Sequence, residues 1–545
     1  MGVPGHGMDA SSAPPQPRGD APNCRCAAAG PQGGGWVSTA VLGRAARLEA
    51  LLGEPYDPGN PYGLDALTAG RTPGRSPRGA AAILSGLVEA EAVPVARGGR
   101  FAGGADLVRA VDPLFGRDAA WGHGWVAGGV RAAEAGGAVL PRAAELARLL
   151  VPAALVAAVR AVLEDVVAAV AGVAPEAAGR WLGALTGVWA DVWACEGLVT
   201  AALRSLELPA DTGAAVRAAA SYAVPLVLSE VLAEADLALA ECAPDGAERV
   251  ARRCAKAAAD VVRLSGRTQA TAGREGLVRA LPWLAGLRAE RDPDTADLLF
   301  GPRPASAGRR ADPAGRSADS ARCHADPAGR RADPARGRAD AGAGTPDRPR
   351  RPGPVPVTLD GSRGLYVGGF VGEVGGPGDC EAAVFGALVS AAGARDGRAG
   401  ADGTGVRDAR SRADGTGNAG GDGCACGVGV PALVRRLVSE WRLLERDRCA
   451  AGGVADAGAR ALADRYAQLL LAGVVVGLRE AAADSGAGLA AGWGWVWLAL
   501  ARVAQRLGVA EDGVPPEVRA AMAGHMRERV ARGTGLGLCP SGGAR

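Results

Sequence analysis

Three glutamates have the residue type and the surroundings to act as general bases. Glu196 lies in the segment WACEGL, and Glu230 and Glu234 are four residues apart in SEVLAEAD. A carboxylate buried inside a helical bundle can have a raised pKa and take up a proton near neutral pH. A solvated helix face accounts for the same spacing, and we favour that interpretation. The catalytic and cofactor-binding residues therefore stay unassigned.

The four histidines do not form a recognisable catalytic set with other residues. His6 and His324 lie in segments that we expect to be unstructured. His123 is expected in a Gly- and Trp-rich turn, AAWGHGWV, and His525 on a polar C-terminal helix that faces solvent. Their spacing predicts neither a Ser/His/Asp nor a Cys/His arrangement.

Closely spaced cysteines are the nearest approach to a metal motif. Cys24 and Cys26 have C-x-C spacing, as do Cys424 and Cys426, and both pairs lie in Gly- and Ala-rich loops. Structural zinc sites use C-x2-C or wider spacing and two further ligands. We therefore predict no metal site.

Two segments resemble phosphate-binding motifs only superficially. Lys256, the only lysine, lies in CAKAAAD and lacks the glycines of a Walker A loop. Gly427, Gly429 and Ala432 have the spacing of a dinucleotide loop, but they follow a glycine-rich linker instead of a strand. Pro431 also removes an amide donor. We interpret this match as chance.

The composition indicates a chain with large buried cores. Its 545 residues are 48% hydrophobic and 22% charged, enough for roughly three or four domains. The net charge of +3 is too small to indicate nucleic acid or an anionic membrane as a partner. The longest apolar runs, Leu149–Val159 and Leu469–Leu478, fall short of the ~18–20 residues of a membrane-spanning helix and predict buried helices. Cys195 and Cys254 read as core residues, and the lack of a disulfide framework predicts a cytoplasmic location.

Helical periodicity dominates the patterned regions, so the expected fold class is mainly α. Between Trp181 and Leu206, apolar or small residues recur at alternating spacings of three and four, which predicts one narrow helical stripe suited to bundle packing. Further helices are predicted over residues 41–53, 80–90, 105–111, 431–448, 461–479 and 495–507, and one that starts near residue 211 and is kinked by Pro225.

Changes in composition divide the chain into five regions. Residues 1–35 lack the apolar segment of a signal peptide and are expected to be disordered. An N-terminal helical region at 36–141 and a helical bundle at 142–300 follow. Residues 301–353 form a linker, expected to be disordered, that repeats the unit ADPAGR. A C-terminal helical extension at 354–545 is interrupted by a second linker at about 393–425.

The order of three sequence blocks resembles an actinobacterial branch of the acyl-CoA dehydrogenases. The first block comprises LGRAARLEALLGEPYDPGNPYG and the later segment Val93–Gly124. The second is Ala194–Leu228, with a Leu-Pro turn and a Y-x-V-P step, and it is similar to the C-terminal bundle of that branch. The third, Ala461–Glu480 with Trp495–Gly508, resembles its C-terminal helical extension. The blocks cover about half of the chain.

This resemblance implies a flavin-dependent oxidation. In the family, an active-site carboxylate removes the α-proton of an acyl thioester while hydride passes to FAD. The bundle forms the subunit interface, so the resemblance also implies a homo-oligomer or an association with an intact paralogue.

Two departures from the family pattern argue against catalysis. The family carries a β-domain between the N-terminal helices and the bundle, whereas only Gly124–Leu150 separates the two blocks in this chain. The family also opens its bundle with a turn of the form R-R-x-x-G that contacts flavin phosphates. The aligned residues here are Ala168 to Gly172, with alanine at both arginine positions, which cannot form a bidentate phosphate contact. The family's later R-D step falls near Ala257 and Ala258.

Two functions follow from the sequence. One is an FAD-dependent acyl-CoA dehydrogenase whose activity has been weakened or lost. The other is a non-catalytic helical bundle that acts as an oligomerisation partner. The repetitive linkers also suggest a third interpretation, a reading frame that is no longer expressed.

Overall fold

The computed structural model consists of α-helices, as the sequence predicts. Of the residues that the structure describes, 88% are helical, and none of them is in a strand. The described residues are 39–60, 62–68, 103–135, 142–173, 175–208, 212–242, 246–282, 293–301, 379–393, 426–447, 456–485, 488–509 and 513–538. They all belong to one compact unit formed by residues 1–304 and 374–545. The expected helix at 80–90 lies outside the described residues, and so do both linkers apart from Gly301 and Gly393 at their edges.

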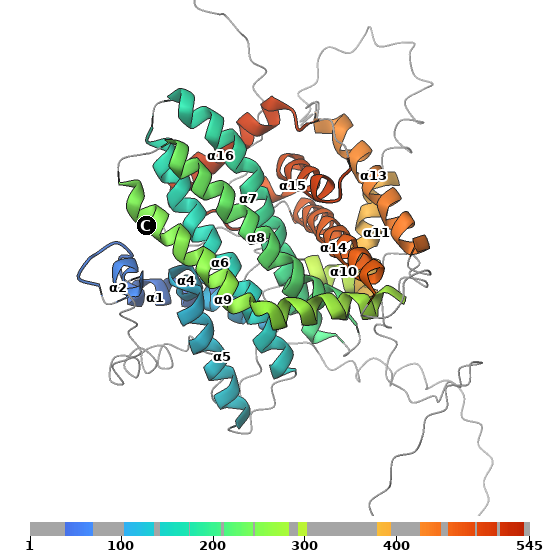
Figure 1. Ribbon diagram of the computed structural model, residues 1–545, viewed down its shortest axis with the longest axis horizontal. Helices are drawn as coiled ribbons and strands as arrows, with labels where there is room; N and C mark the ends of the chain where they lie inside the picture. Colours follow the sequence, from blue (N-terminus) through green and yellow to red (C-terminus); the bar gives the residue numbers. More distant parts are fainter. Residues whose placement is uncertain are drawn as a thin grey trace, which may run out of the picture. The chain divides into compact units, whose positions relative to one another are not determined.

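Among the described residues up to 301, four long helices of 29 to 34 residues are accompanied by shorter ones. The N-terminal part contains α1 (Thr39–Leu52), α2 (Leu64–Thr68), α4 (Gly104–Arg117) and α5 (Ala119–Ala135). The bundle contains α6 (Ala143–Ala171), α7 (Pro175–Arg204), the short 3-10 turn η2 (Ser205–Glu207), α8 (Ala214–Cys242), α9 (Ala247–Ala280) and α10 (Pro293–Phe300). Helices α6 to α9 pack side by side, as Figure 1 shows.

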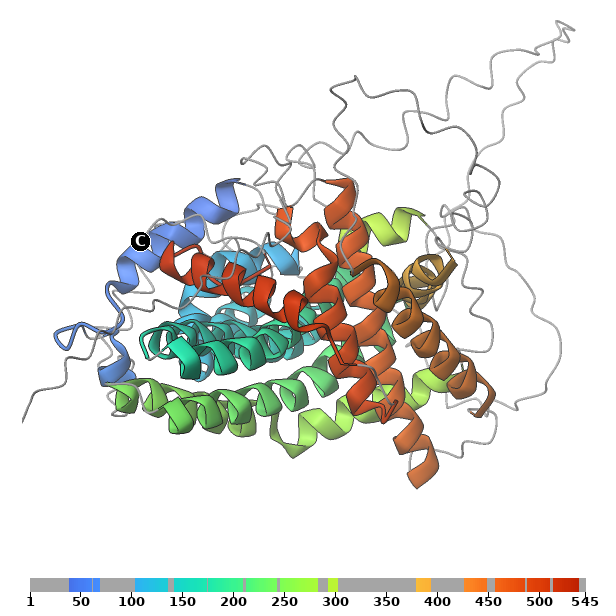
Figure 2. The ribbon, with the colours of Figure 1, turned by 90° about the horizontal axis from the view of Figure 1, so that it is seen from above.

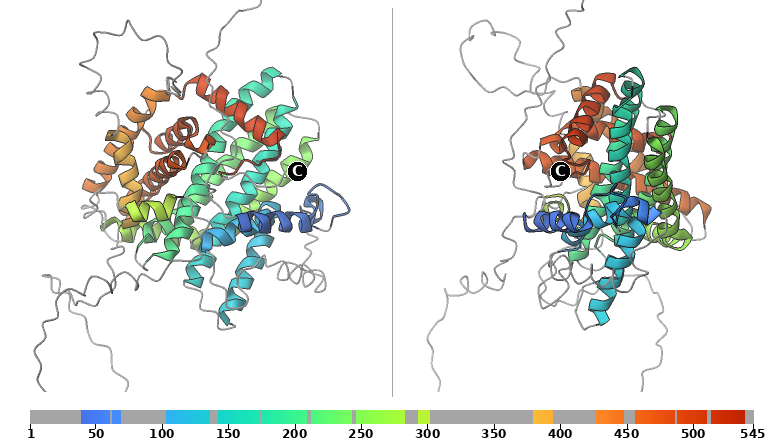
Figure 3. Two further views of the ribbon diagram at one scale, coloured as in Figure 1. Left: turned by 180° about the vertical axis from the view of Figure 1, so that it is seen from behind. Right: turned by 90° about the vertical axis from the view of Figure 1, so that its left-hand side faces the viewer.

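The C-terminal helices complete the same core instead of forming a separate one. They are α11 (Asp379–Gly393), α13 (Cys426–Asp447), α14 (Ala457–Asp484), the 3-10 turn η8 (Gly488–Ala491), α15 (Trp493–Arg506) and α16 (Pro516–Ala531). Helix α14 contacts α7, α8 and α9, and α16 lies across α6 and α7 (Figures 2 and 3). The two sets of helices thereby share one hydrophobic core.

Two apolar helices form the centres of this core. Leu149–Val159 on α6 and Leu469–Leu478 on α14 are buried without interruption, as predicted. A helix that is apolar on every side must be covered on every side. Both helices are long and apolar enough to cross a membrane, but 78% of the most apolar window of α6 and 72% of that of α14 are covered by other parts of the protein. This burial is typical of the central helices of a globular core.

Several predicted elements need correction. The segment around His123 is part of the 17-residue helix α5 and not a turn. Helix α13 starts at Cys426, so Pro431 lies in its second turn rather than at its start. The predicted stripe on α7 was too narrow, because Trp189 and Trp193 on another face of this helix are also fully buried. Periodicity underestimated the burial because tertiary neighbours enclose α7 from several directions.

Glycines allow other helices to approach α14 closely. A Cβ atom added at Gly473 would lie 2.4 Å from Val384 Cγ1 and 2.6 Å from the Val384 carbonyl oxygen of α11. At Gly477 it would lie 2.6 Å from a ring carbon of Phe300 in α10. Carbon atoms in van der Waals contact are about 3.5–4.0 Å apart, so neither position has room for a side chain.

We expect Gly473→Ala to lower the free energy of unfolding by about 1–3 kcal/mol, because the new methyl group would collide with a backbone carbonyl that cannot rotate away. Alanine is intrinsically the better helix former by about 1 kcal/mol, so a stabilised variant would contradict the close approach. The matched control is Gly179→Ala in α7, where nothing lies within 4 Å of the added Cβ. Urea unfolding followed by circular dichroism measures both changes.

Candidate functional site

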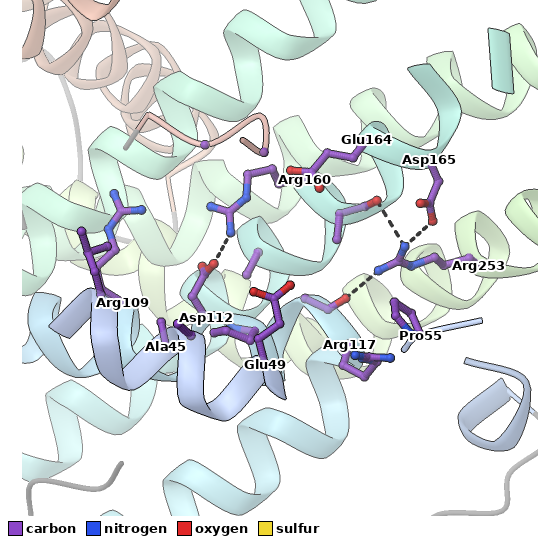
Figure 4. Close-up of a pocket in the computed structure, with 18 of the residues that line it drawn as sticks. Ala45, Glu49, Pro55, Arg109, Asp112, Arg117, Arg160, Glu164, Asp165 and Arg253 are labelled. Atoms are coloured by element: carbon purple, nitrogen blue, oxygen red, sulfur yellow. Dashed lines mark hydrogen bonds and ion pairs between the residues drawn. The ribbon is translucent and has the colours of Figure 1, made fainter. Parts of the chain in front are cut away.

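A small polar cavity lies where the N-terminal helices meet the bundle. Its volume is about 120 Å³, enough for several water molecules. It is enclosed by α1, α4, α6 and α9, by Pro55 and Tyr56 after α1, and by Gly535 and Gly537 near the C-terminus. Figure 4 shows charged side chains from these helices around it.

The charged residues that line the cavity balance one another. They are Arg109, Asp112 and Arg117 on α4, Arg160, Glu164 and Asp165 on α6, Glu49 on α1 and Arg253 on α9. Four guanidinium groups therefore face four carboxylates. Arg160 forms an ion pair with Asp112, and Arg253 forms one with Asp165. A buried charge is tolerated when it is paired in this way.

Glu196 of α7 does not line the cavity but belongs to the same network of ion pairs. Its Oε1 atom lies 2.5 Å from Nη1 of Arg109, and its Oε2 atom lies 3.6 Å from Nη1 of Arg160. Only 6% of its side chain is exposed. Burial by itself would raise the pKa of this carboxyl, but the two guanidinium groups and the N–H of Leu538 outweigh it, and the pKa is lowered. The solvated face that we favoured for Glu196 is therefore wrong, and its lowered pKa does not suit a general base near neutral pH.

Tyr56 and Arg253 share the carboxylate of Asp165. The Tyr56 hydroxyl donates to Asp165, and Arg253 donates to Asp165 and, at 2.8 Å, to the carbonyl of Gly116. Burial, followed by the nearby Asp165 charge, raises the pKa of Tyr56 well above its ordinary value. The phenol stays protonated and acts as a hydrogen-bond donor between the α1–α2 loop and α6.

The C-terminal segment Gly535–Leu538 is held by side chains of the bundle. The N–H of Leu536 donates to Oε1 of Glu164 at 2.7 Å, and the N–H of Leu538 donates to Oε2 of Glu196 at 3.0 Å. The indole N–H groups of Trp189 and Trp193 both donate to the Leu536 carbonyl. Arg529 of α16 donates to the carbonyls of Gly535 and Gly537. We call the five side chains that hold this segment the tail slot: Glu164, Trp189, Trp193, Glu196 and Arg529.

The other two candidate glutamates lie in a different ion-pair network. Glu234 pairs with Arg502, and Glu230 pairs with Arg506 at 2.7 Å. Both arginines also bind Asp191, whose side chain is completely buried in α7. The pairs connect α8 and α7 to α15, so the prediction of a simply solvated face is incomplete for these residues.

The remaining single residues have structural surroundings. Cys195 and Cys254 are buried as predicted; burial raises the pKa of both thiols, that of Cys254 to about 12, so they stay protonated. Lys256 links α9 to Asp118, between α4 and α5, at 2.8 Å. His525 lies on α16, partly exposed and facing Glu528. Across the described ranges, no three His, Cys, Asp or Glu residues are grouped as metal ligands would be.

Gly429 lies within α13, so the dinucleotide-like spacing does not belong to a phosphate-binding loop. A Cβ atom at this position would lie 2.1 Å from the ring of Trp497, which explains the glycine by close packing. The interpretation as a chance match is consistent with this position.

The alanines expected near a flavin phosphate lie beside a second hollow. Ala168 and Ala169 are in the last turn of α6 and border an open hollow of about 900 Å³. Arg249 and Arg252 of α9 line it, but so do Asp165 and Glu248, and their charges sum to zero. The hollow has the volume of a nucleotide site but not the positive charge that a diphosphate requires, and the smaller polar cavity is too small for a flavin. Neither of these two sites fits FAD, and we derive no redox step.

No protein-family model matches the sequence, and neither the curated proteins nor the solved structures include a match to it.

The residues of the polar cavity were not identified from the sequence, although one feature of the sequence indicates them. The run Arg160–Asp165 places three charged residues in the second half of α6, directly after its longest apolar run. Charges on a buried helix must find partners, so this run predicts a buried ionic network. The residues on α4, α7 and α9 that pair with these charges are distant in the sequence, so residue spacing does not predict them.

We expect Glu196→Gln to lower the free energy of unfolding at neutral pH by about 3 kcal/mol, because Arg109 and Arg160 would lose a buried counter-charge. The lowered pKa of Glu196 means that its contribution is complete above pH 4.5, the ordinary value, and is lost as the pH falls through the folded-state value. The difference between wild type and variant should therefore be constant above about pH 5 and shrink in more acidic solution.

Urea unfolding of both proteins between neutral and acidic pH measures this difference. Glu241→Gln is the control, since this glutamate forms an exposed pair with Arg180. A Glu196→Gln variant as stable as the control at every pH would show that the network contributes little to the fold.

Proposed function

We propose that this protein is a non-catalytic helical bundle that associates with a second copy of itself through the outer face of α8 and α9. The observation that carries the proposal is an exposed apolar stripe on these two helices. Leu226 is 47% exposed and Leu237 is 50% exposed on α8, and Val262 is 75% exposed on α9. Large exposed apolar side chains that lie together are typical of interaction surfaces.

The two exposed leucines lie on α8, and the exposed Val262 lies on the adjoining helix α9. Leu226 and Leu237 are eleven residues apart, close to three helical turns, so they project from the same side of α8. Helices α8 and α9 are antiparallel: Cys254 Sγ lies 3.6 Å from the carbonyl of Leu232, and Gly273 lies against Tyr222. Val262 lies eight residues after Cys254 and before the kink of α9 at Gly266, so it lies within about one helical turn of the level of Leu226.

Small residues surround the large ones. On α8, Ala233 is exposed between the two leucines together with Glu230 and Asp236, and Ala240 is exposed beyond Leu237; on α9, Ala258 and Ala259 are exposed near Val262. Small side chains allow another helix to approach closely. The stripe from Leu226 to Ala240 is about 21 Å long, so it would form the apolar centre of an interface with a polar rim. A two-fold dimer would place the same stripe on both sides of the contact.

Sedimentation velocity tests the proposal. We expect the wild-type chain to sediment as a dimer or larger oligomer and the double variant Leu226→Glu/Leu237→Glu to sediment as a monomer, because four carboxylates would be buried in the contact. Leu51→Glu is the matched control, because Leu51 on α1 is 52% exposed but lies away from the stripe. A monomeric wild type at the highest soluble concentration would overturn the proposal.

An absorbance spectrum separates this function from a flavoenzyme. We expect the purified protein to show no flavin absorbance, before or after incubation with FAD and removal of free FAD. Flavin absorbance that remains with the protein would instead support the acyl-CoA dehydrogenase activity that the resemblance implies.

A further inference from the structure

The tail slot has the chemistry of a peptide-binding site. Its side chains contact five backbone polar groups of the segment Gly535–Leu538: the N–H groups of Leu536 and Leu538 and the carbonyls of Gly535, Leu536 and Gly537. Sites that bind peptide segments recognise the main chain by hydrogen bonds and individual side chains by pockets. This slot provides both kinds of contact.

The sequence of the tail matches the slot at each position. Leu536 is completely buried, whereas Leu538 is partly exposed. Gly535 has φ of +69°, a conformation that favours glycine. Gly533 and Thr534 end α16 with hydrogen bonds to the carbonyls of Val530 and Arg529, which directs the chain from the helix into the slot.

The slot is built from groups that are costly to bury without an occupant. Glu196 is held as a carboxylate, and Glu164 also accepts a tail N–H. Arg529 lies over the rings of Trp189 and Trp193, at 5.9 and 5.5 Å from their centroids, which fixes its direction. Glu196 would keep Arg109 and Arg160 if the tail left, but the indole N–H groups of Trp189 and Trp193 would lose their acceptor, so an empty slot would favour a replacement ligand.

The tail also forms a wall of the polar cavity. Gly535 and Gly537 line the cavity together with Arg109, Arg160 and Glu164. Departure of the tail would therefore expose this charged lining to solvent. The same tail residues therefore fill the slot and close the cavity.

We propose that the tail slot is a recognition site for a Gly-Leu-Gly-Leu peptide segment, and that residues 535–538 of the chain are its resident and exchangeable ligand. In the structure the segment of the same chain occupies the slot, and a tail from a second copy is the alternative outcome of the test. The proposal is independent of the α8–α9 interface.

The test uses the full-length Leu536→Asp variant, whose new carboxylate cannot stay in a buried slot beside Glu164 and Glu196. The probe is a fluorescent peptide with the sequence Thr-Gly-Leu-Gly-Leu and an amidated end, and fluorescence anisotropy reports its binding. We expect the variant to bind the peptide with one-to-one stoichiometry and at least about tenfold more tightly than wild type, in which the resident tail competes.

Two matched controls identify the groups that bind. A peptide with aspartate in place of the first leucine should not bind. The double variant Glu196→Gln/Leu536→Asp should bind the original peptide about tenfold more weakly, because a charged acceptor for the Leu538-equivalent N–H is lost. Circular dichroism confirms that each variant is folded.

A folded Leu536→Asp variant that does not bind the peptide would overturn the proposal. If this variant is unfolded, Gly535→Val takes its place, because valine opposes the positive φ and dislodges the tail without adding a charge. Failure of the folded Gly535→Val variant to bind would overturn the proposal in the same way.

Sedimentation identifies the source of the resident tail. An unchanged mass of Leu536→Asp relative to wild type would assign the tail to the same chain, and a lower mass would assign it to a second copy. The Leu226→Glu/Leu237→Glu variant separates the two proposals, because it should lose self-association through α8 and α9 but keep the tail slot occupied.

Discussion

The buried carboxylate of Glu196 connects the parts of this protein that are farthest apart in the sequence. It pairs with Arg109 of α4 and Arg160 of α6, and it accepts the N–H of Leu538 from the C-terminal segment. A charge in a helical core is stable only when such partners are present. The N-terminal helices, the bundle and the tail must therefore assemble together for any one of them to be correctly placed.

A similar arrangement joins the C-terminal helices to the bundle. Asp191 of α7 is completely buried and pairs with Arg502 and Arg506 of α15. Apolar faces such as those of α6 and α14 can pack in several registers at similar cost, whereas a buried ion pair is satisfied in few. We interpret the two networks as the features that select one packing of these apolar helices.

The sequence predicted the helices well where the apolar pattern was regular. It located α1, α13, α14 and α15 to within a few residues and identified the buried runs of α6 and α14. It misplaced His123 because glycine and tryptophan suggest a turn when they are considered without neighbours. It misjudged Glu196 because a helical stripe shows which residues are apolar, but not which polar residues other elements will cover.

The sequence by itself determined the mainly α fold class, since helical periodicity and helix ends are properties of neighbouring residues. Only the tertiary structure decided the ionic network and the tail slot. Glu164 and Leu536 are 372 residues apart, and Glu196 and Leu538 are 342 residues apart. No local sequence pattern encodes such pairs. The packing of apolar helices removes water from these polar groups, and they then form hydrogen bonds with each other.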